Sequence, residues 1–213
     1  MNMLLEKNDT DFCKKGYFAI RLPQNFRITD EQAEELIAKN DYKLEFFANT
    51  LFIKFMAHNT YSARMNTRCS SQVDRWNEEN KLGFVYDCDT GFRLDSGTWA
   101  EPDGAFVSFF KASLEQQLAW KGIANVTPTF LWEMLSNEDD LDKEIAKMEK
   151  IWQAQPDFES GLLIDPFTKK YYYYEKTQEK PRICDFSVHF STSFLPNLII
   201  DFEKIYEYAF GKK

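Results

Sequence analysis

The chain has 213 residues, of which 44% are hydrophobic and 16% aromatic, enough to build one domain around a sizeable core. Its net charge of −8 excludes a protein that binds nucleic acid over its whole surface, because neutralising phosphates requires clustered lysine and arginine. A nucleic-acid site would therefore have to be a local basic groove.

The cysteines and the N-terminus indicate the cellular compartment. The four cysteines stand far apart without a C-x-x-C pair, so neither a zinc site nor a disulfide framework is indicated. Residues 1–12 contain no apolar run long enough for a signal peptide. Every apolar run is interrupted well before the ~20 residues that a membrane-spanning helix needs. We therefore expect a reduced, cytoplasmic protein with no membrane partner.

The first predicted elements are a helix and a hairpin. Thr29 and Gln32 have the spacing of a capping box, which predicts a helix over about 30–39. Residues 43–47 and 50–56 read as two strands of a β-hairpin, because asparagine in the connecting Ala-Asn pair tolerates a tight turn. We treat residues 1–28 as an N-terminal extension that contains an extra strand at about 17–22, and residues 29–213 as the main domain.

A long amphipathic helix is predicted over 61–80, since apolar residues recur there at helical spacing. The predicted inward-facing residues are Tyr61, Met65, Cys69, Val73 and Trp76. Arg64, Arg68 and Arg75 fall in a narrow arc beside this stripe. They are candidates for phosphate contacts, although exposed charged faces of helices are usually only solvated.

The middle of the chain predicts strands followed by a helix. Segments 83–88, 91–94 and 104–109 read as three strands, which we expect to form a meander. The continuous apolar run at 129–135 predicts a buried strand. An amphipathic helix follows, reaching about residue 153, and its apolar face carries Leu141, Ile145, Met148 and Trp152.

The C-terminal third predicts a hairpin and a final helix. Segments 161–164 and 171–175 flank a Pro-containing turn, and a helix over 201–210 ends at Gly211. Tyrosines 171–174 are consecutive, so alternation along a strand places two on each face of the sheet. Strands in runs with helices before, between and after them predict an α/β fold of the α+β type, with a central mixed β-sheet flanked by helices.

Two acidic residues lie in or beside apolar strands, where an unpaired charge is energetically unfavourable. Asp103 lies at the entrance to an apolar strand, and Glu133 interrupts the apolar run 130–135, where an unpaired charge would be strongly disfavoured. A divalent cation shared by the two carboxylates would compensate them. Alternatively, Glu133 points to solvent or binds an arginine such as Arg93.

Several segments resemble one known family. Residues 89–94 (Asp-Thr-Gly-Phe-Arg-Leu) followed by 102–107 (Pro-Asp-Gly-Ala-Phe-Val) resemble the D-T-G-F-R-L and R-P-D-x-x-F-V pattern of the Uma-type restriction endonuclease family. Residues 132–136 and 161–166 are similar to the family's V-E-V-x-S and W-L-V-D-P segments. This family belongs to the PD-(D/E)XK nuclease superfamily, so the resemblance implies a restriction-endonuclease-like core that cleaves phosphodiester bonds with a metal ion.

The resemblance also assigns candidate roles. It implies that Asp103 and Glu133 bind Mg²⁺ or Mn²⁺ and that Glu45 is an additional acid. Leu135 occupies the usual lysine position of the superfamily motif, so the basic residue is expected from the next helix. Lys147 aligns best there and lies nearest the apolar face; the alternative is a solvated lysine.

The resemblance implies DNA as the partner, with Arg64, Arg68 and Arg93 bordering the groove. A nuclease that cuts both strands often works as a homodimer. The acidic surface favours a second hypothesis, an inactive nuclease fold kept as a binding or assembly module, and departures from the family's motifs argue against activity. Glu101 replaces the arginine of the R-P-D motif, and the family's histidine at the start of the long helix is replaced by Ser62 or Ala63.

Overall fold

The larger of two sheets carries Glu133, and Asp103 directly precedes one of its strands. The computed structural model describes residues 17–24, 26, 29, 32, 43–47, 49–54, 60–95, 97–136 and 141–211. Sheet B has the strand order β11-β10-β9-β8-β7-β4. Its strands are β4 (Gly83–Tyr86), β7 (Gly104–Ser108), β8 (Phe130–Met134), β9 (Ser160–Asp165), β10 (Lys170–Glu175) and β11 (Arg182–Asp185). The β8–β9 pair is parallel and the other pairs are antiparallel, so the sheet is mixed, as predicted.

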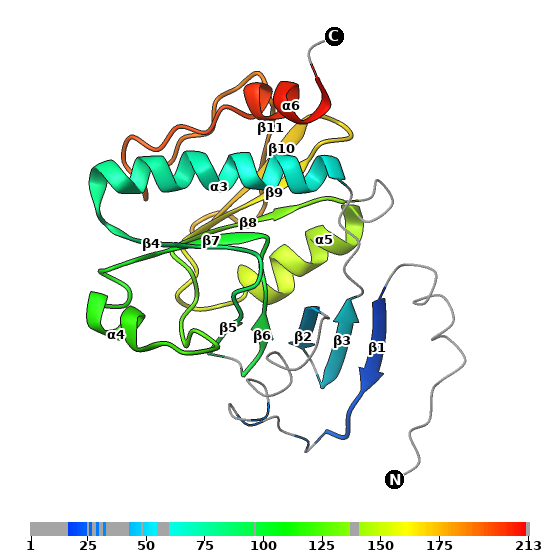
Figure 1. The fold of residues 1–213 in the computed structure, drawn as a ribbon. Coiled ribbons are helices and arrows are strands. Elements are labelled where there is room, and N and C mark those ends of the chain that lie inside the picture. The colour runs from blue at the N-terminus through cyan, green and yellow to red at the C-terminus, as the bar shows by residue number, and fades with distance from the viewer. Residues whose placement is uncertain are drawn as a thin grey trace.

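Sheet A is smaller and contains the N-terminal strands. Its order is β1-β3-β2-β6-β5, and all its pairs are antiparallel. Its strands are β1 (Tyr17–Arg21), β2 (Lys43–Phe47), β3 (Thr50–Lys54), β5 (Phe92–Arg93) and β6 (Trp99–Ala100). The predicted extra strand near residue 17 is thus present and pairs with β3, in the lower right of Figure 1. The boundary at residue 29 stays a prediction.

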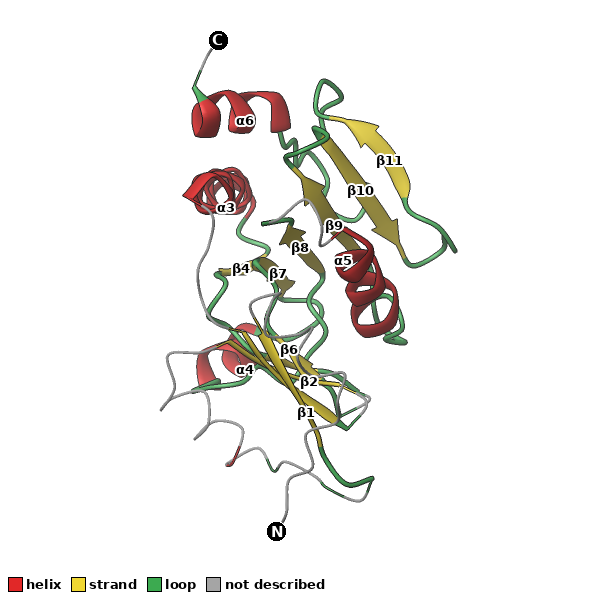
Figure 2. Cartoon of the chain, turned by 90° about the vertical axis from the view of Figure 1, so that its right-hand side faces the viewer, coloured by secondary structure: helices red, strands yellow, loops and turns green. Residues whose placement is uncertain are grey.

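Helices cover both faces of sheet B (Figure 2). Helices α3 (Thr60–Asn80) and α6 (Phe202–Phe210) pack on one face, where Met65, Cys69 and Val73 of α3 are buried. Helix α5 (Leu141–Lys147) and the π-helical turn η2 (Met148–Trp152) pack on the other. The short helix α4 (Leu114–Ala119), which the sequence did not predict, begins with a capping box at Ser113. These layers form the predicted mixed sheet with helical flanks.

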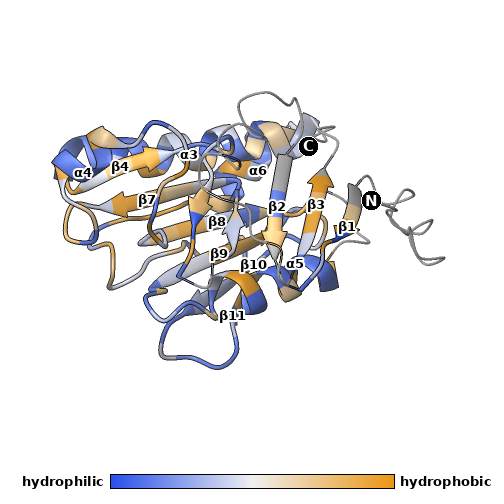
Figure 3. Ribbon diagram, turned by 90° about the horizontal axis from the view of Figure 1, so that it is seen from below, coloured by the Kyte–Doolittle hydropathy of each residue, from blue (hydrophilic) through white to orange (hydrophobic). Residues whose placement is uncertain are grey.

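Strand β10 shows why the sheet needs cover on both sides. Tyr171 and Tyr173 belong to the core under α3 and α6, whereas Tyr172 and Tyr174 belong to the core under η2. Two tyrosines therefore lie on each face, which confirms the prediction from strand alternation. Hydrophobic colours mark β7 in the view from below, consistent with its burial between the helical layers (Figure 3).

Local turn chemistry matches the prediction at both ends of the chain. Asn49 has φ of 60° in the predicted turn between β2 and β3, a left-handed conformation that asparagine tolerates. At the other end, Asp201 caps α6 by accepting from the Lys204 N–H at 3.0 Å, and Gly211 follows the helix with φ of 83°. The hairpin and the last helix are both confirmed.

The first predicted helix is described only at its start. The backbone N–H of Thr29 donates to Gln32 Oε1 at 3.0 Å, and the Gln32 N–H donates to Thr29 Oγ1 at 3.2 Å. These are the reciprocal bonds of the predicted capping box. The helix over residues 33–39 lies outside the described residues, as does the start of the helix predicted after residue 136.

The predicted meander is wrong. Strands β4 and β7 pair directly with each other in sheet B, while β5 pairs with β6 in sheet A. The chain therefore reverses between β5 and β6, where the Gly97 N–H donates to the Leu94 carbonyl oxygen at 2.9 Å. Strand β6 has only two residues and was too short to recognise from its pattern. Tyr61 also differs from expectation: it is 43% exposed and stacks on Phe210, with ring centroids 4.5 Å apart.

No helix that the structure describes has the length and apolar character needed to cross a membrane.

Candidate active site

The pairing of two strands brings the two candidate metal ligands close to each other. Gly104 of β7 pairs with Trp132 of β8, so Asp103, which directly precedes β7, comes beside the end of β8 that carries Glu133. The charge of Asp103 accordingly acts on Glu133. The backbone N–H of Met134 donates to Asp103 Oδ2 at 2.6 Å, which fixes this carboxylate against β8.

Glu133 is buried and held by two donors. Its side chain is 3% exposed, although it sits in an otherwise apolar strand. Its Oε1 accepts from the indole N–H of Trp152 at 2.8 Å and lies 2.8 Å from Lys147 Nζ. The carboxylate therefore neither points to solvent nor depends on Arg93 for its compensation.

Lys147 connects Glu133 to an acid from the other sheet. Lys147 Nζ lies 2.5 Å from Oε1 of Glu45 on β2 and donates to the Glu101 carbonyl oxygen at 3.3 Å. The lysine is only 7% exposed, so the predicted inward orientation is confirmed. The structure thus brings together all four predicted residues, Glu45, Asp103, Glu133 and Lys147, although their catalytic roles stay predictions.

Burial and neighbouring charges shift the pKa values of both Glu133 and Lys147. Burial raises the pKa of Glu133 to about 7, and the nearby carboxylates Asp103, Glu144 and Glu45 add to the rise, while Lys147 opposes it. For Lys147, burial alone would lower the pKa, but the surrounding carboxylates, Glu133 foremost, raise it well above its ordinary value. The lysine is therefore firmly cationic, and one ammonium does not neutralise the buried acids around it.

Asp103 is supported by α3 through a residue that the sequence did not single out. The side-chain amide of Asn66 donates to the Asp103 carbonyl oxygen at 2.8 Å, and its Oδ1 accepts from the Trp132 indole at 2.7 Å. Asn66 directly follows Met65 of the buried stripe, and this position beside the stripe is the sequence feature that could have identified it. The bonds join α3, β7 and β8 beside the candidate site.

Two of the three candidate DNA-contacting arginines contact the last helix rather than the acidic site. Arg64 donates to the Ala209 carbonyl oxygen at 3.1 Å, and the Arg68 guanidinium lies 3.6 Å from the Tyr208 ring centroid, so both side chains contact α6. Arg93 lies half-buried on β5 of sheet A. Asn66, rather than Arg64 or Arg68, is the α3 residue that bonds to Asp103, and the DNA role of the arginines stays a prediction.

The donor set fits a hard divalent cation. Two neighbouring carboxylates with excess buried negative charge suit Mg²⁺ or Mn²⁺, which commonly use one or two carboxylates and complete their shell with water and phosphate oxygens. No group of three or more His, Cys, Asp or Glu side chains within the described residues is arranged to hold a metal. A cation at Asp103 and Glu133 would therefore depend on water and substrate for its other ligands.

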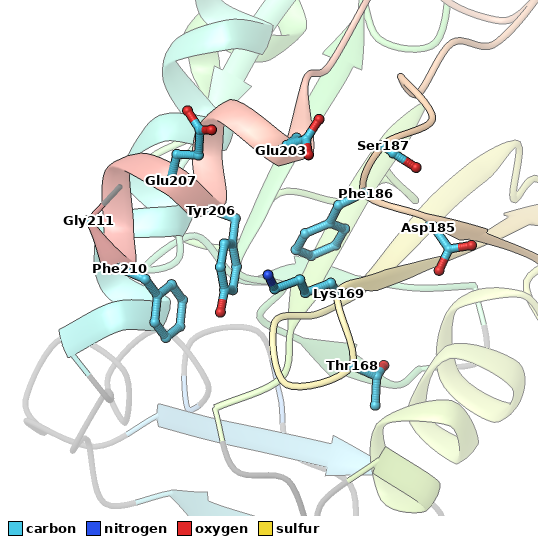
Figure 4. Close-up of a pocket in the computed structure, with 10 residues that line it drawn as sticks. All are labelled: Thr168, Lys169, Asp185, Phe186, Ser187, Glu203, Tyr206, Glu207, Phe210 and Gly211. Carbon is cyan, nitrogen blue, oxygen red and sulfur yellow. The ribbon is translucent and has the colours of Figure 1, made fainter. Parts of the chain in front are cut away.

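A separate pocket of about 750 Å³ lies between α6 and the turn that joins β9 to β10. Figure 4 shows Lys169 and Tyr206 projecting into it, and the Lys169 Nζ lies 4.3 Å from the Tyr206 ring centroid. Asp185, Glu203 and Glu207 contribute carboxylates to the lining. None of the four candidate catalytic residues lines this pocket, so it is distinct from the acidic site.

Comparison with known proteins agrees with this architecture. The solved structure of a putative nuclease belonging to DUF820 from Anabaena variabilis is similar to this chain with a TM-score of 0.63 and 16% sequence identity, covering 78% of this chain and 90% of that one. The similarity shows a restriction-endonuclease-like fold. A search of curated proteins found no match. The family model Uma2, described as "Putative restriction endonuclease", matches residues 30–203, and the chain therefore belongs to this family.

Proposed function

We propose that this protein is a metal-dependent endonuclease that hydrolyses phosphodiester bonds of DNA. Family membership supports a nuclease-type function. The observation that carries the proposal is the buried carboxylate of Glu133, which lies 2.8 Å from Lys147 and close enough to Asp103 for the two charges to interact. Neighbouring carboxylates beside a desolvated ammonium provide ligands for a cation and a positive charge for a phosphate.

Each residue has a defined part in the proposed reaction. Asp103 and Glu133 hold Mg²⁺ or Mn²⁺, and a bound divalent cation supplies Lewis-acid stabilisation of the phosphate and activation of the attacking water. Lys147 holds a fixed positive charge beside Glu133 and stabilises the negative charge that develops on the phosphate oxygens. Glu45 orients Lys147 from sheet A through their ion pair.

The direct test replaces Asp103 with asparagine. Asp103→Asn retains the shape of the side chain but removes its charge, so we expect at least about tenfold weaker Mn²⁺ binding and loss of plasmid nicking. Binding is measured by isothermal titration calorimetry, and nicking is measured with the metal that binds. The control is Asp157→Asn, since Asp157 lies 3.5 Å from Lys111 in a separate ion pair.

Unchanged metal binding in Asp103→Asn would contradict the proposed ligand. A wild-type protein that binds neither Mg²⁺ nor Mn²⁺ at millimolar concentration would exclude the metal-dependent nuclease. In that case the fold would serve as a binding or assembly module.

Metal affinity should depend on pH. Since the pKa of Glu133 is raised to about 7 and a metal ligand must be ionised, binding below pH 7 displaces a proton. The Mg²⁺ affinity should fall by up to about tenfold per pH unit below 7 and level off above it, as expected for the release of one proton. Calorimetry at pH 6 and pH 8, in buffers that differ in ionisation enthalpy, measures the affinity and the protons released. A flat profile without proton release would contradict this assignment.

A further inference from the structure

The helix that carries Lys147 changes its winding immediately after this residue. Helix α5 is α-helical through Lys147 and continues as the π-helical turn η2 over Met148–Trp152. The Gln153 N–H donates to the Met148 carbonyl oxygen, five residues earlier, at 2.8 Å. Single π-helical turns of this kind are rare inside helices and are frequent at functional sites.

The wider turn brings two residues onto the same side of the helix. Lys147 and Trp152 are five residues apart, which in an α-helix separates side chains by about 140° around the axis. In a π-turn, residues five apart come into register, because its hydrogen bonds join residues i and i+5. This explains how the Lys147 ammonium and the Trp152 indole both reach Oε1 of Glu133, each at 2.8 Å.

Both contacts are desolvated and specific. Trp152 is fully buried, and Glu133 is nearly so. Trp152 also packs in the core between η2 and sheet B, so its ring position is fixed independently of the hydrogen bond. An indole N–H can only donate, and it therefore selects a carboxylate oxygen as its partner.

From this geometry we propose that Trp152 is a positioning residue, placed by the π-turn, that fixes the rotamer of Glu133 and so sets the direction in which its carboxylate meets the metal. The inference rests on the proposed function for its metal. Residues that hydrogen-bond to metal ligands commonly change metal affinity by about 10–100-fold when they are mutated.

The first experiment tests the contact without any metal. In a ¹H–¹⁵N spectrum of the full-length protein, Trp152→Phe identifies the Trp152 indole resonance by its loss. Glu133→Gln should then shift this resonance more than those of the other four tryptophans, because a charged acceptor becomes neutral. A Trp152 resonance that stays in place in Glu133→Gln would overturn the proposed positioning role, whether or not the protein binds metal.

The second experiment measures the effect on binding. Trp152→Phe retains an aromatic ring but removes the N–H, and we expect about tenfold weaker Mn²⁺ binding by calorimetry. The matched control is Trp76→Phe, which removes an indole N–H that donates to the Pro196 carbonyl oxygen at 3.0 Å on the other face of the sheet. The control should lose comparable thermal stability and retain the wild-type Mn²⁺ affinity.

The outcomes separate the two proposals. If wild type binds Mn²⁺ and Trp152→Phe binds it equally well, the positioning role is overturned while the proposed nuclease stands. If wild type binds no metal but the indole resonance responds to Glu133→Gln, the proposed nuclease fails and the positioning of Glu133 is upheld.

Discussion

Lys147→Met should reduce plasmid nicking by about 10²–10³-fold while leaving Mn²⁺ binding intact, because it removes a charge that stabilises the transition state without removing a metal ligand. Methionine fills the space of the buried lysine stem but cannot bind Glu45 or Glu133. Single-turnover nicking at saturating Mn²⁺ measures the loss, and calorimetry measures binding in the same preparation.

The variant should also be less stable without metal. Removing one partner of a buried ion pair typically costs about 3–5 kcal/mol, since the remaining carboxylates are left without their counter-ion. Mn²⁺ should recover part of this loss, because a ligand that binds only the folded state stabilises it. Thermal unfolding with and without Mn²⁺ measures both effects.

Lys143→Met is the matched control, because Lys143 lies one helical turn earlier, is partly exposed, and sits 3.8 Å from Glu144. It should nick at close to the wild-type rate. Full nicking by a folded Lys147→Met protein would remove the lysine from the mechanism. Loss of Mn²⁺ binding in the same variant would show that Lys147 organises the ligands.

Much of the fold was predictable because its signals are local. The stripe at Met65, Cys69, Val73 and Trp76, the hairpin turn at Asn49 and the cap at Asp201 each depend on a few neighbouring residues, and each is present. Strand partners were less predictable. The exchange of strands between sheets near residue 95 depends on pairing of β5 with β6 and of β4 with β7, which no local pattern encodes.

The candidate site likewise contains residues that local sequence patterns predict and residues that they do not. Asp103 and Glu133 were recognisable because a carboxyl group in an apolar strand needs compensation. The inward side of Lys147 followed from its helical phase. Trp152 was placed only in the core stripe, since a search at α-helical spacing cannot detect that a π-turn puts residues five apart in register. Asn66 was missed because polar residues beside a core stripe are usually exposed.

Gly104→Ala should destabilise the protein by about 3 kcal/mol or more, at the upper end of what overpacking a core usually costs. A Cβ at this position would lie 2.0 Å from Cζ2 of the Trp132 ring. Trp132 is fully buried and hydrogen-bonded to Asn66, so the ring cannot move aside without breaking the bond between α3 and β8. For a chain of this size, such a loss lowers the melting temperature by roughly 6–12 °C.

Two other glycines make this test specific to the site. Gly161→Ala should cost less than about 1 kcal/mol, because its Cβ would meet first the flexible methyl end of Met148, at 2.9 Å. Gly83→Ala, whose Cβ would lie 2.0 Å from the Val107 carbonyl oxygen at the far end of β7, should destabilise as strongly as Gly104→Ala. Only Gly104→Ala should also weaken Mn²⁺ binding below its melting temperature, since Gly104 adjoins Asp103 and pairs with Trp132, the neighbour of Glu133. Equal Mn²⁺ affinity in folded Gly104→Ala and Gly83→Ala would show that the metal site does not depend on this pairing.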